Sequence, residues 1–521
     1  MSSELIASLQ NSQVYAHATQ EFHVYETHIS WVVLTGEYAY KIKKPVNFGF
    51  LDFSSLEQRR YFCEQEVKLN QRLAPELYLK VVPISGTCTQ PLLGDTRQVF
   101  EYAIKMRQFD PKQVLNEVQA RGELEIRHMQ DLATKLADFH QKIACADASF
   151  TLGTPAQVWA PMLQNFQQIE PLLTDAQDQQ QMQQLAAWAQ ETYQRLQPLL
   201  AERLAKGFVR ECHGDVHLAN VTLIDDEVKL FDCIEFNDEF RWIDVMSEIA
   251  FIVMDLEDRG LEAYAHSFLN TYLEMTGDYQ GLALLDFYKA YRAMVRAKIN
   301  LFCAADPQAS DTQKAAALAN YRSYAQLAES YTELKSPYLL LTLGVAGSGK
   351  STLSAYVLQQ LGGIRLRSDV ERKRLFGLAA DANSHSALAS GIYTQEATEK
   401  TYAHLAQTAQ ALLQAGYSVT LDATHLRRWQ RDAMRQVAEN LGLPALVIVL
   451  QAPLDILEAR IRKRALRKGE ASEATLEVLH QQLAQLEPLT PEEEIYALHV
   501  DTEAPKANQQ LVTCLQQRLS S

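Results

Sequence analysis

Long apolar segments and paired cysteines are missing from this sequence. No apolar run approaches the ~18 residues that a membrane-spanning helix requires. The start of the chain, Met-Ser-Ser-Glu-Leu, has neither the basic nor the apolar region of a secretory signal. The seven cysteines lie far apart and form no CxxC pair, which is typical of reduced thiols and provides no zinc site. We therefore expect a cytoplasmic protein without a membrane partner.

Basic residues are in deficit, and the deficit is confined to one part of the chain. The 521 residues include 49 Lys or Arg and 64 Asp or Glu, which gives a net charge of −15. Residues 336–521 contain 19 of each sign, so residues 1–335 carry the whole excess of negative charge. Because phosphate backbones are bound by Lys and Arg, this balance argues against nonspecific nucleic-acid binding by the first part. The asymmetry suggests two domains with different functions and does not indicate the oligomeric state.

Two patterns of secondary structure follow one another along the chain. Before residue 335, we expect strands at Trp31–Leu34, Tyr38–Lys43 and Val99–Met106, a helix at Ser54–Leu73, and long helices over residues 125–200. After Pro337, single strands alternate with helices, the pattern of a parallel α/β sheet, with strands at Tyr338–Leu343, Ser418–Leu421 and Ala445–Leu450. We therefore expect one domain over residues 1–335, including a helical linker, and a second over residues 336–521.

The strongest motif opens the second domain. Its residues fit GxxxxGK[ST] in full, follow an apolar strand and begin a helix at Thr352: Gly344, Val345, Ala346, Gly347, Ser348, Gly349, Lys350 and Ser351. The glycines let the backbone wrap around phosphate oxygens, and the helix N-terminus adds a partial positive charge. Lys350 is expected to reach the β- and γ-phosphates of ATP, and the Ser351 hydroxyl to bind Mg²⁺.

Three further features follow this phosphate-binding loop. Asp369 and Arg372 come about one β–α unit later, where Asp369 could accept a proton from a substrate hydroxyl and Arg372 could hold an anionic substrate group. Asp422 ends a predicted strand and is a candidate for the Mg²⁺ shell. Arg460 and Arg464 share one helix face in an Arg-rich segment that could act as a lid over the transferring phosphate, although such runs are also typical of solvated helices.

In this order of motifs, residues 338–521 resemble the small-molecule P-loop kinases related to polynucleotide 5′-hydroxyl kinases and zeta-toxin-type kinases. The resemblance implies a three-layer α/β/α fold, with Asp369 as the base and Arg460 or Arg464 in contact with ATP. Such regions are often grouped with AAA family ATPases. The second region of homology and the arginine finger of a true AAA machine are not recognisable in this sequence.

A second set of catalytic residue types lies in the first domain. Asp215 stands five residues before Asn220 in His-Gly-Asp-Val-His-Leu-Ala-Asn, and Asp232 follows a predicted strand seventeen residues after Asp215. A protein-kinase catalytic loop has the same spacing between its base and an Mg²⁺-binding Asn, followed by a metal-binding Asp. Asp215 is therefore predicted to be a catalytic base, and Asn220 and Asp232 are predicted Mg²⁺ ligands, since both offer oxygen atoms.

This pattern resembles the aminoglycoside phosphotransferase branch of the kinase-like fold over roughly residues 20–300. The resemblance implies a phosphate-binding lysine at Lys41 or Lys43, which point the same way on one strand, and a partner at Glu66. No GxGxxG loop precedes the lysine, which leaves the choice between ATP and GTP open in this domain. Both halves, in this order, resemble the bifunctional aminoglycoside phosphotransferase/ATP-binding proteins.

The acceptor is not specified by these motifs. The acidic first half favours a cationic acceptor, whereas Arg292 and Arg296, which share a helix face with Tyr288, could bind an anionic group. We interpret these arginines as part of an ion-pair stripe. Asp244 is interpreted as a helix cap or structural acceptor.

The sequence thus predicts two ATP- and Mg²⁺-dependent phosphotransferase modules that act on a hydroxyl group of a small molecule. One alternative is a nucleotide-sensing ATPase with a catalytically silent first domain. Another is a nucleic-acid 5′-hydroxyl kinase. The family resemblance does not by itself imply aminoglycoside resistance.

Overall fold

The computed structural model describes residues 2–49, 51–147, 150–380, 382, 391–464 and 475–519. It divides the chain into two compact units. Unit 1 comprises Met1–Asp255 and Phe287–Ala328, and unit 2 comprises Leu256–Asp286 and Glu329–Ser521. Within the described ranges, no helix combines the length and apolar character that a membrane crossing requires.

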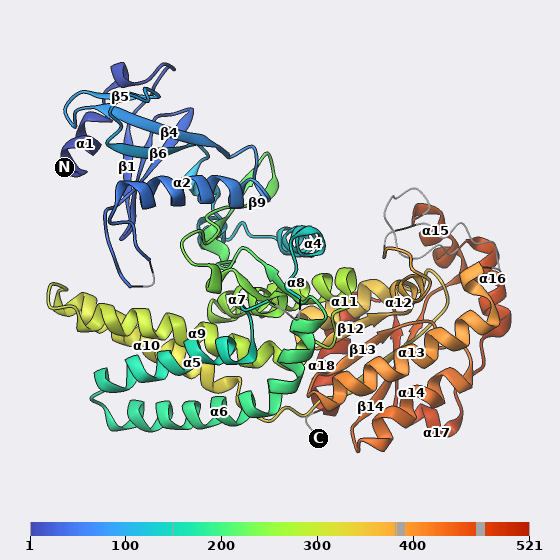
Figure 1. Cartoon of the computed structure of the whole chain (residues 1–521). Helices are drawn as coiled ribbons and strands as arrows, with labels where there is room; N and C mark the ends of the chain where they lie inside the picture. The colour runs from blue at the N-terminus through green and yellow to red at the C-terminus, as the bar shows by residue number, and fades with distance from the viewer. Residues whose placement is uncertain are drawn as a thin grey trace. The chain divides into compact units, whose positions relative to one another are not determined.

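Unit 1 contains an antiparallel six-stranded sheet near its N-terminus (Figure 1), and its strand order is β1-β2-β3-β6-β4-β5. The strands are β1 (His23–Glu26), β2 (Ser30–Leu34), β3 (Tyr38–Lys43), β4 (Tyr78–Gly86), β5 (Pro91–Leu93) and β6 (Glu101–Arg107). Helix α2 (Leu56–Asn70) starts at a capping box formed by Ser55 and Gln58. It buries Cys63 against Ile104 and Met106, and so covers one face of the sheet. The strands and the helix predicted for this region are confirmed, with ends that differ by up to three residues.

The rest of unit 1 consists of helices and two short antiparallel strand pairs. Strand β7 (Val209–Glu211) pairs with β10 (Trp242–Asp244), and β8 (Val221–Ile224) pairs with β9 (Glu227–Leu230). The helices are α1 (Ser2–Ser8), α3 (Leu115–Ala120), α4 (Ile126–Lys142), α5 (Pro155–Ile169), α6 (Ala176–Ala205), α7 (Val245–Asp258), α9 (Leu282–Ala305) and α10 (Asp311–Ser330), the last three extending past the limits of the unit. Asp244 accepts a 2.8 Å hydrogen bond from the Met246 N–H at the start of α7, which confirms its predicted capping role.

Unit 2 contains a parallel five-stranded sheet in the order β12-β13-β11-β14-β15. Its strands are β11 (Leu339–Leu343), β12 (Ile364–Arg367), β13 (Val419–Asp422), β14 (Ala445–Gln451) and β15 (Ala497–Asp501). Every residue of the central strand β11 is buried, as expected for a sheet with helices on both faces. The helices are α8 (Glu262–Thr276), α11 (Lys350–Leu361), α12 (Ser368–Leu375), α13 (Gln395–Gln414), α14 (Arg428–Asn440), α15 (Leu454–Arg464), α16 (Leu476–Gln485), α17 (Pro491–Glu494) and α18 (Ala507–Leu519).

Helix α8 marks the difference between the observed units and the predicted domain ranges. It lies in the sequence well before residue 336, yet it packs on α11 and β12 of unit 2. The Asn270 side chain accepts a 2.7 Å hydrogen bond from the Arg365 N–H and donates to the Gly363 carbonyl at 3.1 Å. These bonds satisfy backbone groups at the edge strand of the sheet. The segment Leu256–Asp286 is therefore part of unit 2.

Candidate active sites

The loop between β7 and β8 places Asp215 beside Asn220. The amide nitrogen of Asn220 donates to the Asp215 carboxylate at 2.9 Å and to the Asp215 carbonyl at 3.0 Å. Nε2 of His217 lies 3.4 Å from the same carboxylate. The Asp215 side chain keeps 36% of its surface exposed, so it remains accessible. Burial acts to raise the pKa of Asp215, but His217, Arg296 and His213 lower it below its ordinary value, so this carboxylate is ionised at neutral pH.

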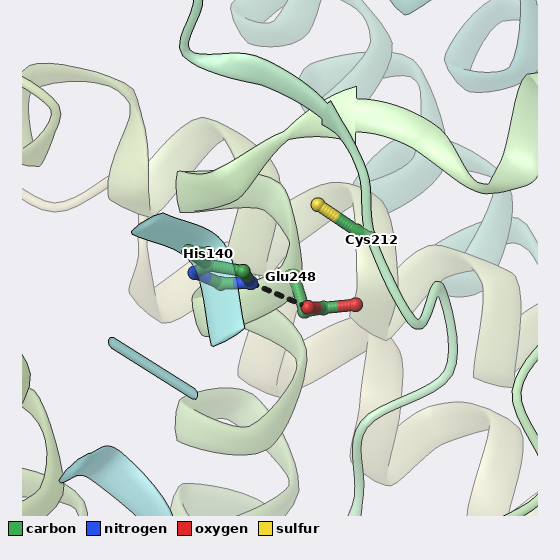
Figure 2. A group of neighbouring side chains, drawn as sticks. All are labelled: His140, Cys212 and Glu248. Atoms are coloured by element: carbon green, nitrogen blue, oxygen red, sulfur yellow. Dashed lines mark hydrogen bonds and ion pairs between the residues drawn. The ribbon is translucent and has the colours of Figure 1, made fainter. Parts of the chain in front are cut away.

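This loop is supported by a buried side-chain contact between α4 and α7. Nε2 of His140 lies 2.6 Å from one Glu248 oxygen (Figure 2), and the Gly214 N–H donates to the other at 2.6 Å. Gly214 has φ +91°, and a Cβ there would lie 2.7 Å from the Phe240 carbonyl oxygen, so glycine is required. The sequence motif marks Gly214, but nothing in it points to His140 or Glu248, which meet only through packing.

Cys212 lies next to this pair, and ligand atoms of the three side chains are within 4.8 Å of one another. Two ligands of a tetrahedral zinc ion lie about 3.3 Å apart, which is longer than the 2.6 Å contact between His140 and Glu248. Burial also raises the pKa of the Cys212 thiol, so it is protonated. We therefore interpret His140 and Glu248 as support for the catalytic loop.

The segment of Asp232 is bonded both to the same loop and to β4. The Phe231 N–H donates to the Asn220 carbonyl at 3.0 Å, and the Asp232 N–H donates to the Tyr78 hydroxyl at 3.0 Å. Asp232 has φ +64°, a left-handed conformation that is rare outside glycine and often found at functional sites. Its side chain is 45% exposed. Asn220 and Asp232, predicted as Mg²⁺ ligands, thus lie on directly bonded segments.

The two candidate lysines on β3 have different partners. Nζ of Lys41 lies 2.6 Å from Asp232 Oδ1 and 2.7 Å from Glu66 Oε1. Lys43 instead contacts Glu66 at 2.6 Å and Glu235, and its ammonium lies over the Phe53 ring. Burial acts to raise the pKa of Glu66, but the two lysines hold it at about 2. Lys41 is therefore the lysine that joins the α2 carboxylate to Asp232.

In unit 2, the predicted phosphate-binding loop connects β11 to α11. Gly347 has φ +81°, and a Cβ there would lie 2.7 Å from the Leu457 carbonyl oxygen, so the loop needs glycine at this position. The Ala346 N–H donates to the Gln482 side chain at 2.7 Å, and Lys350 Nζ donates to the Val345 carbonyl at 2.9 Å. The Ser348 hydroxyl is buried and has no hydrogen-bond partner within the described ranges. Such a loop offers donors that suit phosphate oxygens.

Two carboxylates act on Lys350. Asp422 ends β13 and accepts a 3.2 Å hydrogen bond from Ser354, and Asp369 lies in the first turn of α12. Burial lowers the pKa of Lys350 to about 8, although Asp422 and Asp369 act to raise it. The structure thus groups Lys350, Asp422 and Asp369, while Ser351 and Thr352 are exposed at the start of α11.

The three arginines predicted to bind ATP or substrate, Arg372, Arg460 and Arg464, have different surroundings. Arg372 is buried and donates to the Ile392 carbonyl at 2.8 Å and to Thr398 at 3.3 Å. Arg460 donates to the Gly347 carbonyl at 3.1 Å, which places it at the phosphate-binding loop, where it also pairs with Glu503. Arg464 ends α15 and acts to lower the pKa of Lys350. The remainder of the predicted lid, from residue 465, lies outside the described residues.

Glu274 of α8 is a contact of this site that sequence reasoning missed. Its carboxylate lies 2.7 Å from Arg365 and 3.3 Å from Arg367, and Arg367 lies 3.8 Å from Asp422. Another residue of this segment, Tyr279, donates to Glu371 of α12 at 2.8 Å. About ninety residues separate the partners, and no motif marks Glu274.

Comparison with known proteins identifies both halves. Residues 54–285 match the Phosphotransferase enzyme family, and residues 339–489 match an AAA domain. An uncharacterized protein of Mycobacterium tuberculosis is 31% identical over 464 residues, covering 87% of this chain and 88% of that protein. An adenylyl-sulfate kinase of Myxococcus xanthus is 29% identical over 137 residues, covering 26% of this chain and 69% of that protein. The structure of a choline/ethanolamine kinase family protein of Mesorhizobium loti covers 63% of this chain and 98% of its own, with 10% identity and a TM-score of 0.38.

The two family matches show a chain in which a kinase-like domain of the phosphotransferase type precedes a P-loop kinase domain. The chain belongs to the same family as the mycobacterial protein. The resemblances and the fold class predicted from the sequence for the two halves are confirmed. The phosphotransferase match ends at residue 285, so the segment that carries α8 belongs to this domain by sequence and to unit 2 by packing.

Proposed function

We propose that both modules transfer the γ-phosphate of ATP to a hydroxyl group of a small molecule. The observation that carries this proposal for the first module is the chain of contacts from Glu66 through Lys41 to Asp232. Kinase-like enzymes use such a lysine and carboxylate pair on the phosphates and the metal ion. The assembled residues also count against a catalytically silent first domain, which would not need them.

In the first module, Asp215 orients the acceptor hydroxyl and accepts its proton. The low pKa of Asp215 keeps it ionised, so it is available as an acceptor at neutral pH. The amide nitrogen of Asn220 donates to Asp215, so its amide oxygen remains available to bind Mg²⁺. The partly exposed carboxylate of Asp232 is the second ligand. When bound, Mg²⁺ neutralises charge on the transferring phosphate. Lys41 binds the phosphates of the nucleotide, while Lys43 and Glu235 hold Glu66 in place.

In the second module, the phosphate-binding loop and Lys350 bind the β- and γ-phosphates, and Ser351 and Asp422 hold Mg²⁺. Asp369 serves as the base, and Arg460 stabilises charge at the loop. Arg372 already donates to Ile392 and Thr398. We therefore assign it mainly a role in shaping the acceptor site, with substrate contact as a second role. The relative named adenylyl-sulfate kinase supports a small-molecule acceptor for a kinase module. A nucleic-acid 5′-hydroxyl end is the alternative acceptor, and the cytoplasmic location stays a prediction.

The first module is tested by titrating Mg²⁺-ATP into the full chain that carries Lys350→Ala. This substitution removes the phosphate-binding lysine of the second module, so that its contribution to binding is reduced. We expect saturable binding that is weakened by Lys41→Met. Absence of nucleotide binding in the Lys350→Ala chain would remove the kinase assignment of the first module. The reciprocal titration, into the chain that carries Asp232→Ala, tests the second module in the same way.

A further inference from the structure

Two arginines of α9, Arg292 and Arg296, lie beside the catalytic loop. Arg292 is 8% exposed and donates to the Gly214 carbonyl at 3.3 Å and to Ser247 at 3.4 Å. Both distances are long for a hydrogen bond from nitrogen to oxygen. Arg296 lies one helical turn further on. Within the described ranges, neither arginine forms an ion pair, so the ion-pair stripe favoured from the sequence is not observed.

The two guanidinium groups converge on one aromatic ring. Their central carbons lie 4.8 Å and 5.3 Å from the centre of the Phe251 ring, and the His217 ring lies 5.4 Å from it. His217 in turn contacts Asp215. Phe251, His217 and the two arginines therefore form one cluster on the side of the loop that carries the catalytic carboxylate.

Two N–H donor groups in this cluster have no hydrogen-bond partner among the described residues. Nε of Arg292 and Nε of Arg296 are both buried, and neither has a hydrogen-bond partner among the residues that the structure describes. A buried donor without a partner costs about 1–3 kcal/mol, and more when it is charged. An arginine offers five N–H donors in a fork that matches carboxylate and phosphate oxygens. Cation–π contact with Phe251 compensates part of the charge but uses no N–H donor.

We propose that Arg292 and Arg296 form an anion-binding subsite, so that the acceptor of the first module carries a phosphate or carboxylate group as well as the hydroxyl that is phosphorylated. This inference rests on the proposed kinase function of Asp215, because it places the anionic group beside that residue. Residues 1–335 hold the whole net charge of −15, which repels anions at long range. An anionic acceptor therefore needs nearby cations, such as Arg292 and Arg296, to offset this repulsion.

The two arginines have separate roles in this subsite. Arg292 is the positioning residue, since it is bonded to the catalytic loop at Gly214 as well as facing the subsite. Among the residues that the structure describes, the Arg296 side chain makes no such bond, so it contributes mainly charge. A competing explanation is that Arg296 serves only as a counter-charge to Asp215, whose pKa it helps to lower.

Inorganic sulfate is a suitable probe, because it is a dianion and its binding needs no ATP. It is titrated calorimetrically into the full chain carrying Lys350→Ala, at constant ionic strength, so that the phosphate-binding loop contributes little. We expect saturable binding that Arg296→Met weakens about tenfold or more, the equivalent of one charged hydrogen bond. Arg296→Lys, which keeps the charge, should retain most of the affinity. Arg296→Gln replaces the Met variant if that variant melts below the parent.

Absence of saturable sulfate binding, or equal affinity in the parent and the uncharged variant, overturns the proposal. Unchanged sulfate binding with a raised pKa of Asp215 establishes the counter-charge explanation instead. A second measurement incubates the Lys350→Ala chain with labelled ATP and a metabolite extract separated by charge beforehand. Label in products of the anionic fraction supports the subsite, and label only from neutral or cationic fractions overturns it. No label from any fraction counts against the kinase function, and the sulfate titration then decides the subsite alone.

Discussion

Lys41 lies 2.6 Å from Asp232, although 191 positions separate the two residues in the chain. The contact joins the first sheet to the segment that follows β9, and Glu66 completes it from α2. Lys43, two residues away on the same strand, is directed to Glu66 and Glu235 instead. We therefore expect separable functions for the neighbouring lysines, with Lys41 at the proposed nucleotide site and Lys43 in the buried support.

Substitution of the two lysines should separate binding from stability. Lys41→Met should weaken Mg²⁺-ATP binding by about tenfold or more, because a charged donor to phosphate is lost. Lys43→Met should instead lower the free energy of unfolding by about 3 kcal/mol, since it leaves Glu66 and Glu235 buried with one cation fewer. Calorimetric titration and denaturant unfolding of the full chain with Lys350→Ala measure the two effects. The assignment is wrong if Lys43→Met is the variant that loses nucleotide affinity at unchanged stability.

The two aspartates of the first module should fail in different ways. Asp215→Asn removes the base, so turnover should fall by ~10²–10⁴-fold while Mg²⁺-ATP still binds. Asp232→Ala should weaken Mg²⁺-ATP binding itself, because an oxygen ligand of the metal is removed. Titration of Mg²⁺-ATP into both variants of the Lys350→Ala chain compares their nucleotide affinities. Turnover is compared by incubating the same variants with labelled ATP and a metabolite extract. Equal nucleotide affinity in the parent and in Asp232→Ala would contradict the Mg²⁺ assignment, even if the module is a kinase.

The second module should bind nucleotide in a pH-dependent manner. Lys350 has a pKa of about 8 without nucleotide, so it is charged below this pH and becomes neutral as the pH rises through it. Bound phosphate favours the charged form, so the affinity for Mg²⁺-ATP should fall above pH 8, by up to about tenfold per pH unit. The titration uses the chain carrying Asp232→Ala. Lys350→Arg stays charged and should show a flat profile from pH 7 to 9.5, whereas a flat profile in the unsubstituted lysine protein would disprove the assignment.

Sequence reasoning could group those residues of both candidate sites whose proximity is set by local spacing. Asp215 and Asn220 lie five residues apart in one loop, and Lys350 follows its glycines directly, so the chain itself fixes their proximity. The choice between Lys41 and Lys43 could not be made, because both side chains point to the same face of β3 and only packing against Asp232 distinguishes them.

The supporting contacts could not be predicted, because they depend on tertiary packing alone. Glu248 reaches Gly214 from α7, and no pattern in the sequence relates these residues. Glu274 forms ion pairs with arginines of β12 from a helix that ends about sixty residues before the predicted boundary. The sequence pattern of an amphipathic helix indicates which face is buried, but it does not indicate the sheet against which that face packs.

Because α8 packs on unit 2, we expect a protein cut between residues 335 and 336 to be less stable than unit 2 in the full chain. A protein of residues 336–521 alone would lose the two side-chain hydrogen bonds of Asn270 and the ion pairs of Glu274 with Arg365 and Arg367. At about 1 kcal/mol for each of the two Asn270 bonds, the melting temperature should fall by roughly 4–8 °C relative to unit 2 in the full chain.

Addition of a peptide spanning residues 256–286 should restore part of this loss, and the same peptide with Asn270→Ala and Glu274→Gln should restore less. Hydrogen exchange at the Arg365 N–H reports the contact directly, because that group is bonded to Asn270. If residues 336–521 alone melt at the temperature of unit 2 in the full chain, and the Arg365 N–H is equally protected, α8 contributes nothing to the stability of the P-loop domain. The division at residue 335 would then describe the folding units better than the packing does.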